Sequence, residues 1–122
     1  MQRIIFDIMK HTVKQAFINA GLNAARADIC AQIHTESSCD GIYSHGLNRV
    51  ARFVDYVKQG WIAIDADPTL VKSLGAIEIY DGQRGIGITN ALFATEQASK
   101  IAKENGIGIV ALRNTTHWMR GG

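Results

Sequence analysis

The sequence predicts a mixed α/β (α+β) fold, in which N-terminal helices are followed by a short sheet with one covering helix. Three observations predict it. Apolar residues recur at helical spacing through the first half of the chain, β-branched and aromatic residues gather between residues 70 and 80, and an unbroken apolar run stands near the end. The chain has 122 residues, 47% of them hydrophobic and 20% charged, which is the composition of an ordinary globular protein.

Two helices are expected in the first part of the chain. Asp7 is the expected N-cap of the first helix and Gly21 its stop. Its helically spaced apolar residues are Met9, Val13, Ala16, Phe17 and Ala20. Asn23 is the expected N-cap of the second helix, which runs to about Cys39. The side that this helix is expected to pack carries Ala27, Cys30, Ala31 and His34.

A third helix is expected after the turn signal Asp40-Gly41. It begins near Ser44, whose hydroxyl would cap it, and Gly60 ends it. The residues that it is expected to bury are apolar and helically spaced: Val50, Phe53, Val54 and Val57, with Trp61 as a further candidate.

Two short strands are expected within Leu70–Tyr80, joined by a turn at Leu74-Gly75-Ala76. A glycine loop, Asp81–Gly87, comes next. These elements open a second part of the chain, so residues 1–66 are expected to form a helical segment and residues 67–122 the start of a mixed α/β domain.

The last helix and the last strand follow the glycine loop. Thr89 or its neighbour is the expected N-cap of a helix that runs to Asn105, with Gly106 in the C′ position. Ile107–Leu112 is apolar without alternation, which is the pattern of a strand covered on both faces.

Composition excludes several classes of function. The formal net charge is only +2, and the cationic residues are scattered, so nucleic acid is not an expected partner. No stretch approaches the roughly 20 consecutive apolar residues of a membrane span, and the N-terminus lacks the apolar core of a signal peptide. The two cysteines, Cys30 and Cys39, have no C-x-x-C spacing, which favours a reducing cytoplasm.

The segment Tyr43-Ser44-His45-Gly46-Leu47-Asn48-Arg49 is the first candidate site. On a helix that begins at Ser44, the side chains of His45, Arg49, Arg52 and Tyr56 would share one face. Arg49 could bind a carboxylate through two parallel hydrogen bonds, and His45 could transfer a proton near neutral pH. The pattern therefore suits an anionic substrate. A solvated helix face that carries one histidine would have the same pattern.

The second candidate site is the segment Asn114–Gly122, which contains His117. It follows the C-terminal end of the expected last strand, where open α/β sheets place their ligands. A histidine, an aromatic ring, an arginine and two glycines in one loop could line a pocket for a flat cofactor or an acidic substrate. The alternative is an ordinary surface loop.

Two further patterns are weak. The glycine loop fails the dinucleotide-binding pattern G-x-G-x-x-G, because Asn90 stands where the last glycine should be, and Arg113 rather than an acidic residue follows the strand. A structural turn is therefore favoured over a pyrophosphate site. Cys30 and His34 have the spacing of half a metal site, but no second pair matches them, so no metal is expected.

Three blocks together resemble the malate/L-lactate dehydrogenase family, which consists of NAD(P)H-dependent oxidoreductases without a Rossmann fold. The blocks are Tyr43-Ser44-His45-Gly46-x-x-Arg49, Gly106–Asn114 and His117-Trp-Met-Arg-Gly-Gly122. The resemblance implies that a nicotinamide cofactor, NADH or alternatively NADPH, exchanges hydride with a 2-keto or 2-hydroxy acid. It also implies that His45 is the proton donor, and that Ser44, Arg49 and His117 lie near the substrate and nicotinamide.

The resemblance further implies a homodimer and a longer chain, because family members are longer and most of their cofactor-binding segments lie beyond the point that matches residue 122. The cofactor-binding residues are therefore unassigned. Two other functions stay open. One is an inactive helical assembly module, and the other is a small nucleotide binder in which Gly82–Gly87 contacts a pyrophosphate.

Overall fold

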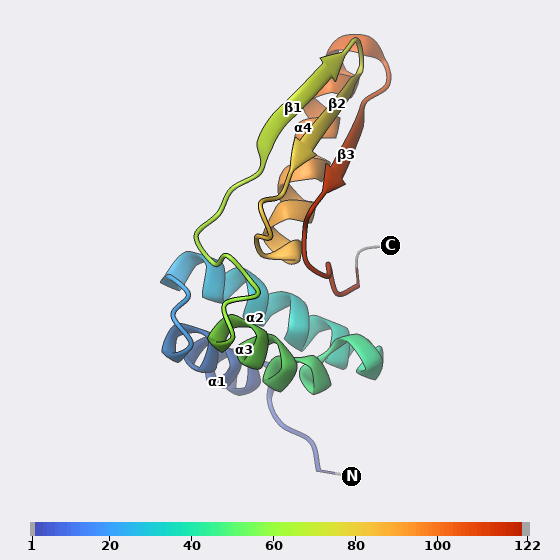
Figure 1. The fold of residues 1–122 in the computed structure, drawn as a ribbon. Coiled ribbons are helices and arrows are strands. Elements are labelled where there is room, and N and C mark those ends of the chain that lie inside the picture. The colour runs from blue at the N-terminus through green and yellow to red at the C-terminus, as the bar shows by residue number, and fades with distance from the viewer. Residues whose placement is uncertain (1, 121–122) are drawn as a thin grey trace. The chain divides into compact units, whose positions relative to one another are not determined.

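The computed structural model describes residues 2–120, which form two compact units. The first unit contains the chain up to Ile64 together with the residues from Met119, and the second is Asp65–Trp118. Figure 1 labels their helices and strands. Within the described residues, none of the helices combines the length and the hydropathy needed to cross a membrane.

The first unit is helical. Its elements are α1 (Phe6–Asn19), α2 (Ala24–Cys39), the 3-10 turns η1 (Tyr43–His45) and η2 (Leu47–Arg49), and α3 (Val50–Lys58). Helices α1 and α2 pack against each other, and their buried apolar residues make most of the core of this unit. The core comprises Val13, Phe17, Ala27, Cys30 and Ala31 of the two helices, together with Leu22 and Ile62 from outside them.

The caps of the first two helices differ in how far they follow the prediction. Asn23 caps α2 as expected, since its side chain accepts a hydrogen bond from the backbone N–H of Arg26 at 2.9 Å. The expected cap at Asp7 is wrong, because α1 begins at Phe6 and Ile5 is its N-cap residue. Asp7 lies instead in the first turn, where a carboxylate is favoured by the positive end of the helix dipole.

The third helix begins later than predicted. Ser44 does not cap it, because Gly46 has φ −112° and ψ −132° and so separates η1 from η2, and α3 begins only at Val50. The apolar side of α3 is half-buried rather than buried. Phe53 packs its ring edge-on against Phe17 with the ring centroids 5.0 Å apart.

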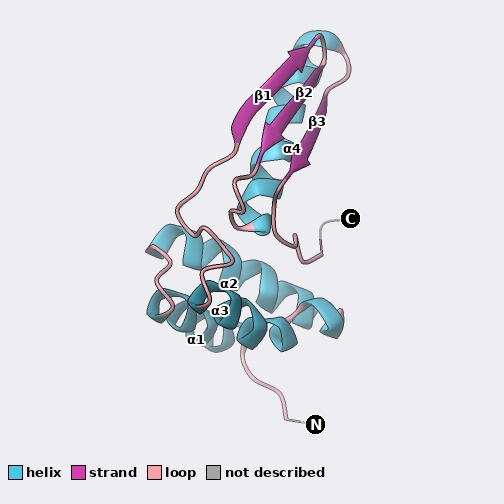
Figure 2. Ribbon diagram, viewed as in Figure 1, coloured by secondary structure: helices cyan, strands magenta, loops and turns pink. Residues whose placement is uncertain are grey.

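The second unit is a three-stranded sheet with one helix on it. Its elements are β1 (Thr69–Leu74), β2 (Ile77–Asp81), α4 (Gly87–Asn105) and β3 (Ile109–Arg113). The strand order is β1-β2-β3, in which β1 and β2 are antiparallel and β2 and β3 are parallel. Helix α4 connects β2 to β3 and lies along one face of the sheet (Figure 2). The predicted mixed fold class is confirmed.

The core of this unit lies between α4 and the face of β2 that is turned toward it. Its buried apolar residues are Tyr80, Ile86, Ile88, Ala94 and Ile101. The rings of Tyr80 and Phe93 meet edge-on at 4.9 Å. The Tyr80 hydroxyl donates to Glu78 at 2.7 Å, and Gln97 of α4 donates to the same carboxylate oxygen at 3.0 Å. Burial, followed by the Glu78 carboxylate, raises the pKa of Tyr80 to about 12.

The expectation that the last strand is covered on both faces is wrong for the described chain. Along β3 exposure alternates, so that Val110 and Leu112 are half-buried while Ile109 and Ala111 are exposed. Ile109 pairs with Ile77 of β2, which is also exposed. The run is apolar throughout because both faces of the strand carry apolar side chains. One face is covered by α4, and the other is exposed in the described part of the chain.

The ends of α4 are set by different groups. The helix begins at Gly87 with Ile86 as its N-cap residue, so the expected cap at Thr89 is wrong. The Thr89 hydroxyl donates to the Ile86 carbonyl at 3.1 Å instead of accepting from an N–H. Gly106 ends the helix as predicted, in the left-handed conformation at φ 82°.

Candidate functional site

The first candidate site is formed by the two consecutive 3-10 turns. Oγ of Ser44 lies 2.8 Å from Nδ1 of His45. Nε of Arg49 donates to the backbone carbonyl of Ser44 at 2.8 Å. These two bonds join the hydroxyl, imidazole and guanidinium groups into one cluster on the surface of the first unit.

Gly46 and Ser38 fix the backbone of this cluster to α2. The Ser38 hydroxyl accepts a hydrogen bond from the backbone N–H of Leu47 at 2.8 Å. A Cβ atom at Gly46 would overlap this hydroxyl and would lie 2.9 Å from the Ser38 nitrogen. Only glycine therefore allows the two turns to approach α2 so closely. Ser38 was not singled out in the sequence because its partner is nine residues away and outside its helix.

The structure corrects the expectation of one helix face with four site residues. His45 lies in η1, before the break at Gly46, whereas Arg52 and Tyr56 lie in α3. Tyr56 contacts the ring of Trp61 with the centroids 5.1 Å apart. The hydrogen bonds described above join Ser44, His45 and Arg49.

The bonds of the cluster define what each group can do. When Nδ1 of His45 carries a hydrogen, it donates to Ser44 Oγ. Nε of Arg49 is already bonded to a carbonyl, so its two terminal nitrogens are the pair suited to a carboxylate. The cluster thus combines a permanent positive charge with an imidazole that can accept or donate a proton.

His117 lies in the second unit, on the loop that follows β3, and its side chain is exposed. The structure thus brings Ser44, His45 and Arg49 together in the first unit and places His117 with the sheet. Gly121 and Gly122, which the sequence groups with His117, lie outside the described residues.

The glycine loop is a structural turn, as predicted. Its backbone N–H groups are used by the chain itself: Gly82 donates to Arg113 O at 2.8 Å, Arg84 to Asn114 O at 2.7 Å and Gly87 to Thr116 Oγ1 at 2.8 Å. A pyrophosphate would need such N–H groups as donors. The loop therefore does not fit a dinucleotide phosphate.

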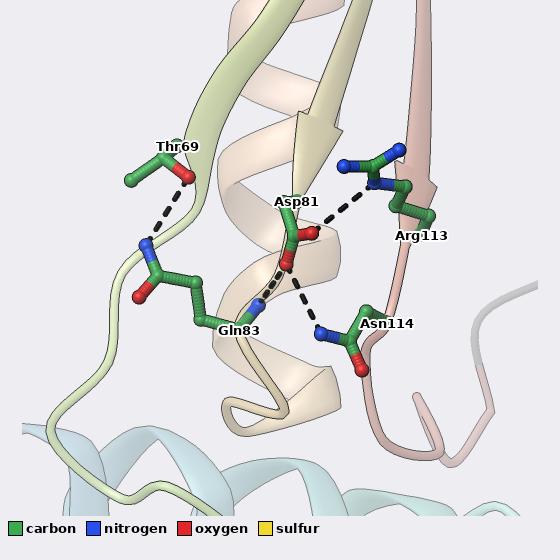
Figure 3. Close-up of polar contacts among 5 residues, drawn as sticks. All are labelled: Thr69, Asp81, Gln83, Arg113 and Asn114. Carbon is green, nitrogen blue, oxygen red and sulfur yellow. Dashed lines mark hydrogen bonds and ion pairs between the residues drawn. The ribbon is translucent and has the colours of Figure 1, made fainter.

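Figure 3 shows a polar network at the carboxyl ends of β2 and β3, which no sequence pattern indicated. The Asp81 carboxylate accepts from the Gln83 N–H at 2.8 Å, from Arg113 Nε at 3.1 Å and from Asn114 Nδ2 at 3.2 Å. The Gln83 hydrogen bond is the main cause of a lowered pKa for Asp81. Gln83 also donates to Thr69 of β1 at 3.1 Å. The network ties the ends of all three strands together.

The Cys30–His34 pair is part of the first unit's core, as predicted from its position on the packed side. Both residues are fully buried, and Nδ1 of His34 lies 2.7 Å from the Cys30 carbonyl oxygen. The His34 ring meets Phe17 edge-on at 5.2 Å. Burial lowers the pKa of His34 and raises that of Cys30 to about 12. Within residues 2–120, no group of three histidine, cysteine or carboxylate side chains is placed to hold a metal ion.

Two features of the first unit lie outside the predicted site. A groove of about 670 Å³ is lined by residues of the N-terminal segment, α1, α2, η1 and η2, but neither His45 nor Arg49 lines it. Arg120 forms an ion pair with Asp40, with 2.7 Å between nitrogen and oxygen. The two residues are 80 positions apart, so no local sequence pattern could have indicated the pair.

A family model described as malate/L-lactate dehydrogenase matches residues 4–122 of this chain. The chain therefore belongs to the malate/L-lactate dehydrogenase family, and the resemblance seen in its sequence blocks is confirmed.

Relatives and solved structures narrow the comparison. The 2,3-diketo-L-gulonate reductases of Shigella boydii serotype 4 and Escherichia coli are each 42% identical to this chain over 120 residues, which cover 98% of this chain and 36% of the relative. The malate dehydrogenase of Pyrococcus horikoshii OT3 superposes with a TM-score of 0.92 at 26% identity, over 97% of this chain and 34% of that structure. The sulfolactate dehydrogenase of Methanocaldococcus jannaschii gives 0.87 at 30% identity, over 93% and 33%. This chain thus spans about a third of the length of these proteins.

Proposed function

We propose that this chain carries the proton-transfer and carboxylate-binding groups of an NADH-dependent reductase of 2-keto acids, of the type of 2,3-diketo-L-gulonate reductase. The observation that carries the proposal is the hydrogen-bonded cluster of Ser44, His45 and Arg49 in a chain of the malate/L-lactate dehydrogenase family. The proposal includes a small anionic keto or hydroxy acid as substrate, a cytoplasmic location and a homodimer.

The chemistry of ketone reduction suits this cluster. When hydride adds to the carbonyl carbon of a keto acid, negative charge develops on the carbonyl oxygen. A protonated His45 stabilises that charge and then gives the oxygen a proton from Nε2, leaving a neutral imidazole and a hydroxy acid. Ser44 holds the opposite ring nitrogen, at 2.8 Å, and so orients the imidazole for this transfer.

Arg49 would bind the substrate carboxylate. Its bond to the Ser44 carbonyl fixes the guanidinium plane relative to the residue before His45. A carboxylate bound to the terminal nitrogens is then held in two places, which restricts the orientation of the adjacent ketone. We propose His117 as a further group that contacts the substrate.

The cofactor is a nicotinamide nucleotide in this proposal, NADH rather than NADPH, and it would supply the hydride. The glycine loop at Gly82–Gly87 does not fit its pyrophosphate, because the N–H groups of that loop are bonded to the chain itself. We therefore propose that the described residues transfer the proton, bind the substrate carboxylate and orient the substrate. We assign none of them to binding of the nucleotide phosphates.

The experiment that tests this proposal uses a full-length chimera, in which residues 1–122 are joined to the remaining part of a 2,3-diketo-L-gulonate reductase. In His45→Ala, we expect kcat with 2,3-diketo-L-gulonate to fall by about 10²- to 10⁴-fold, the usual contribution of a general acid. The dissociation constant for NADH should stay within about twofold. Replacement of His11, which is exposed on α1, by alanine is the matched control. Turnover near the unsubstituted rate in His45→Ala would show that another group donates the proton.

A further inference from the structure

The loop that carries His117 is held against the first turn of α4 by hydrogen bonds. The Thr116 hydroxyl accepts a hydrogen bond from the backbone N–H of Gly87 at 2.8 Å and donates one to the Gly85 carbonyl at 2.9 Å. The Thr116 N–H also donates to the Gly85 carbonyl, at 3.4 Å. The Thr116 side chain, next to His117 in sequence, is therefore hydrogen-bonded to both Gly85 and Gly87, where α4 begins.

Asn90 fastens the same loop from inside the unit. Its side chain is 1% exposed, and Nδ2 donates to Thr115 Oγ1 at 2.8 Å and to the Gly82 carbonyl at 3.3 Å. Its Oδ1 has no hydrogen-bond partner among the described residues. A buried amide with an unsatisfied oxygen costs free energy, which the two hydrogen bonds of its nitrogen offset.

The glycines allow this close packing. A Cβ atom at Gly87 would overlap the carbonyl oxygens of Thr116 and His117. A Cβ atom at Gly82 would lie 2.8 Å from Asn90 Nδ2 and 2.9 Å from Thr115 Cβ. The glycine loop thus leaves room for the loop after β3, rather than for a phosphate.

We propose that Asn90 and Thr116 are positioning residues, which hold the loop after β3 against the start of α4 and thereby fix the place of His117. This inference rests on the proposed function, in which His117 contacts the keto acid. An exposed histidine on an unfastened loop would sample many positions, whereas substrate binding needs one. The hydroxyls of Thr115 and Thr116, the two residues before His117, make these hydrogen bonds, and the Thr116 N–H adds one backbone bond.

The first test measures the fastening directly, by NMR of the 122-residue chain. We expect Thr116→Val to raise the hydrogen-exchange rate of the Gly87 amide about tenfold or more, because the acceptor is removed while the side-chain shape is kept. The imidazole ¹³C relaxation of His117 should report greater mobility. Thr116→Ser keeps the hydroxyl and should restore both signals. Thr95→Val is the matched control, since the Thr95 hydroxyl donates within α4, to Ala91 O at 2.9 Å.

Asn90→Ala provides an independent variant, with Asn105→Ala as its control at the other end of the same helix. Asn105 donates to Ile101 O at 3.0 Å and makes no bond to the loop after β3 among those described. We expect Asn90→Ala to mobilise His117 and Asn105→Ala to leave it unchanged.

If Asn90→Ala fails to fold, the two Thr116 variants decide. The proposal is overturned if Thr116→Val leaves the Gly87 and His117 signals within about twofold of the unsubstituted chain, or if Thr116→Ser behaves like Thr116→Val.

The second test uses the full-length chimera and separates this inference from the proposed function. His117→Ala tests the role of the imidazole, and Thr116→Val tests its positioning. We expect both to raise KM for the keto acid about tenfold, with the dissociation constant for NADH within about twofold, and Thr116→Ser to restore KM. If His117→Ala leaves KM unchanged, His117 does not contact the substrate. The NMR measurements then still decide whether Thr116 holds the loop after β3 in place. If His117→Ala raises KM and Thr116→Val does not, the positioning role is wrong and the substrate role stands.

Discussion

The hydroxyl oxygen of Ser44 lies 2.8 Å from Nδ1 of His45, so the residue before the proposed proton donor also holds its ring. Loss of this bond removes one orienting contact and leaves the imidazole in place. We therefore expect Ser44→Ala in the full-length chimera to lower kcat by about tenfold, roughly the value of one hydrogen bond to a charged group. Steady-state rates with a saturating keto acid would measure it. The loss should be much smaller than that in His45→Ala, and an equal loss would contradict the orienting role of the hydroxyl.

The bond between Arg49 and the Ser44 carbonyl leads to a second prediction. Lysine has the same charge but lacks both the Nε donor and the paired terminal nitrogens. We expect Arg49→Lys to raise KM for the keto acid about tenfold or more while kcat changes less, because a carboxylate held by one contact is both weaker and less oriented. Arg3→Lys, at an exposed residue before α1, is the control. A KM within about twofold of the unsubstituted value would show that the carboxylate binds elsewhere.

Much of the fold could be predicted from the sequence because its signals are local. Asn23 and Gly106 mark helix ends through bonds within a few residues of themselves, and both predictions are confirmed. The start of the third helix could not be predicted. It is shifted by the packing of Gly46 against Ser38, a contact between two different elements.

The candidate site was predictable to a similar degree. Ser44, His45 and Arg49 stand within six positions, so a single motif identified a cluster that the structure joins by hydrogen bonds. Thr116 and Gly87 are 29 positions apart, and neither has a pattern that indicates the other. Their bond appears only once the parallel pairing of β2 and β3 places the loop after β3 beside the start of α4.

His34 leads to a prediction about pH. Burial lowers its pKa below the ordinary value of 6.5, so the folded chain keeps this imidazole neutral where the unfolded chain already binds a proton. The stability from His34 is therefore complete above about pH 6.5 and is lost as the pH falls toward the lowered pKa. We expect the free energy of unfolding, measured with urea between pH 7.5 and pH 5, to fall on acidification. His34→Leu should flatten this dependence, and His11→Gln, at an exposed site on α1, should keep it.

The bonds of the glycine loop also predict how the 122-residue chain behaves with the cofactor. Since the N–H groups of Gly82, Arg84 and Gly87 are bonded within the chain, the described residues present no such loop to a pyrophosphate. We expect the purified chain to bind NADH with a dissociation constant no tighter than about 1 mM, which corresponds to only about −4 kcal/mol. Fluorescence titration of NADH would measure it, with the full-length chimera as the positive control. The chain alone should also give no saturable oxidation of NADH with a diketo sugar acid. Tight binding by the chain would contradict this prediction. If Arg84→Ala then abolished that binding, the glycine loop would be the nucleotide site, and if it did not, the site would lie elsewhere in residues 1–122.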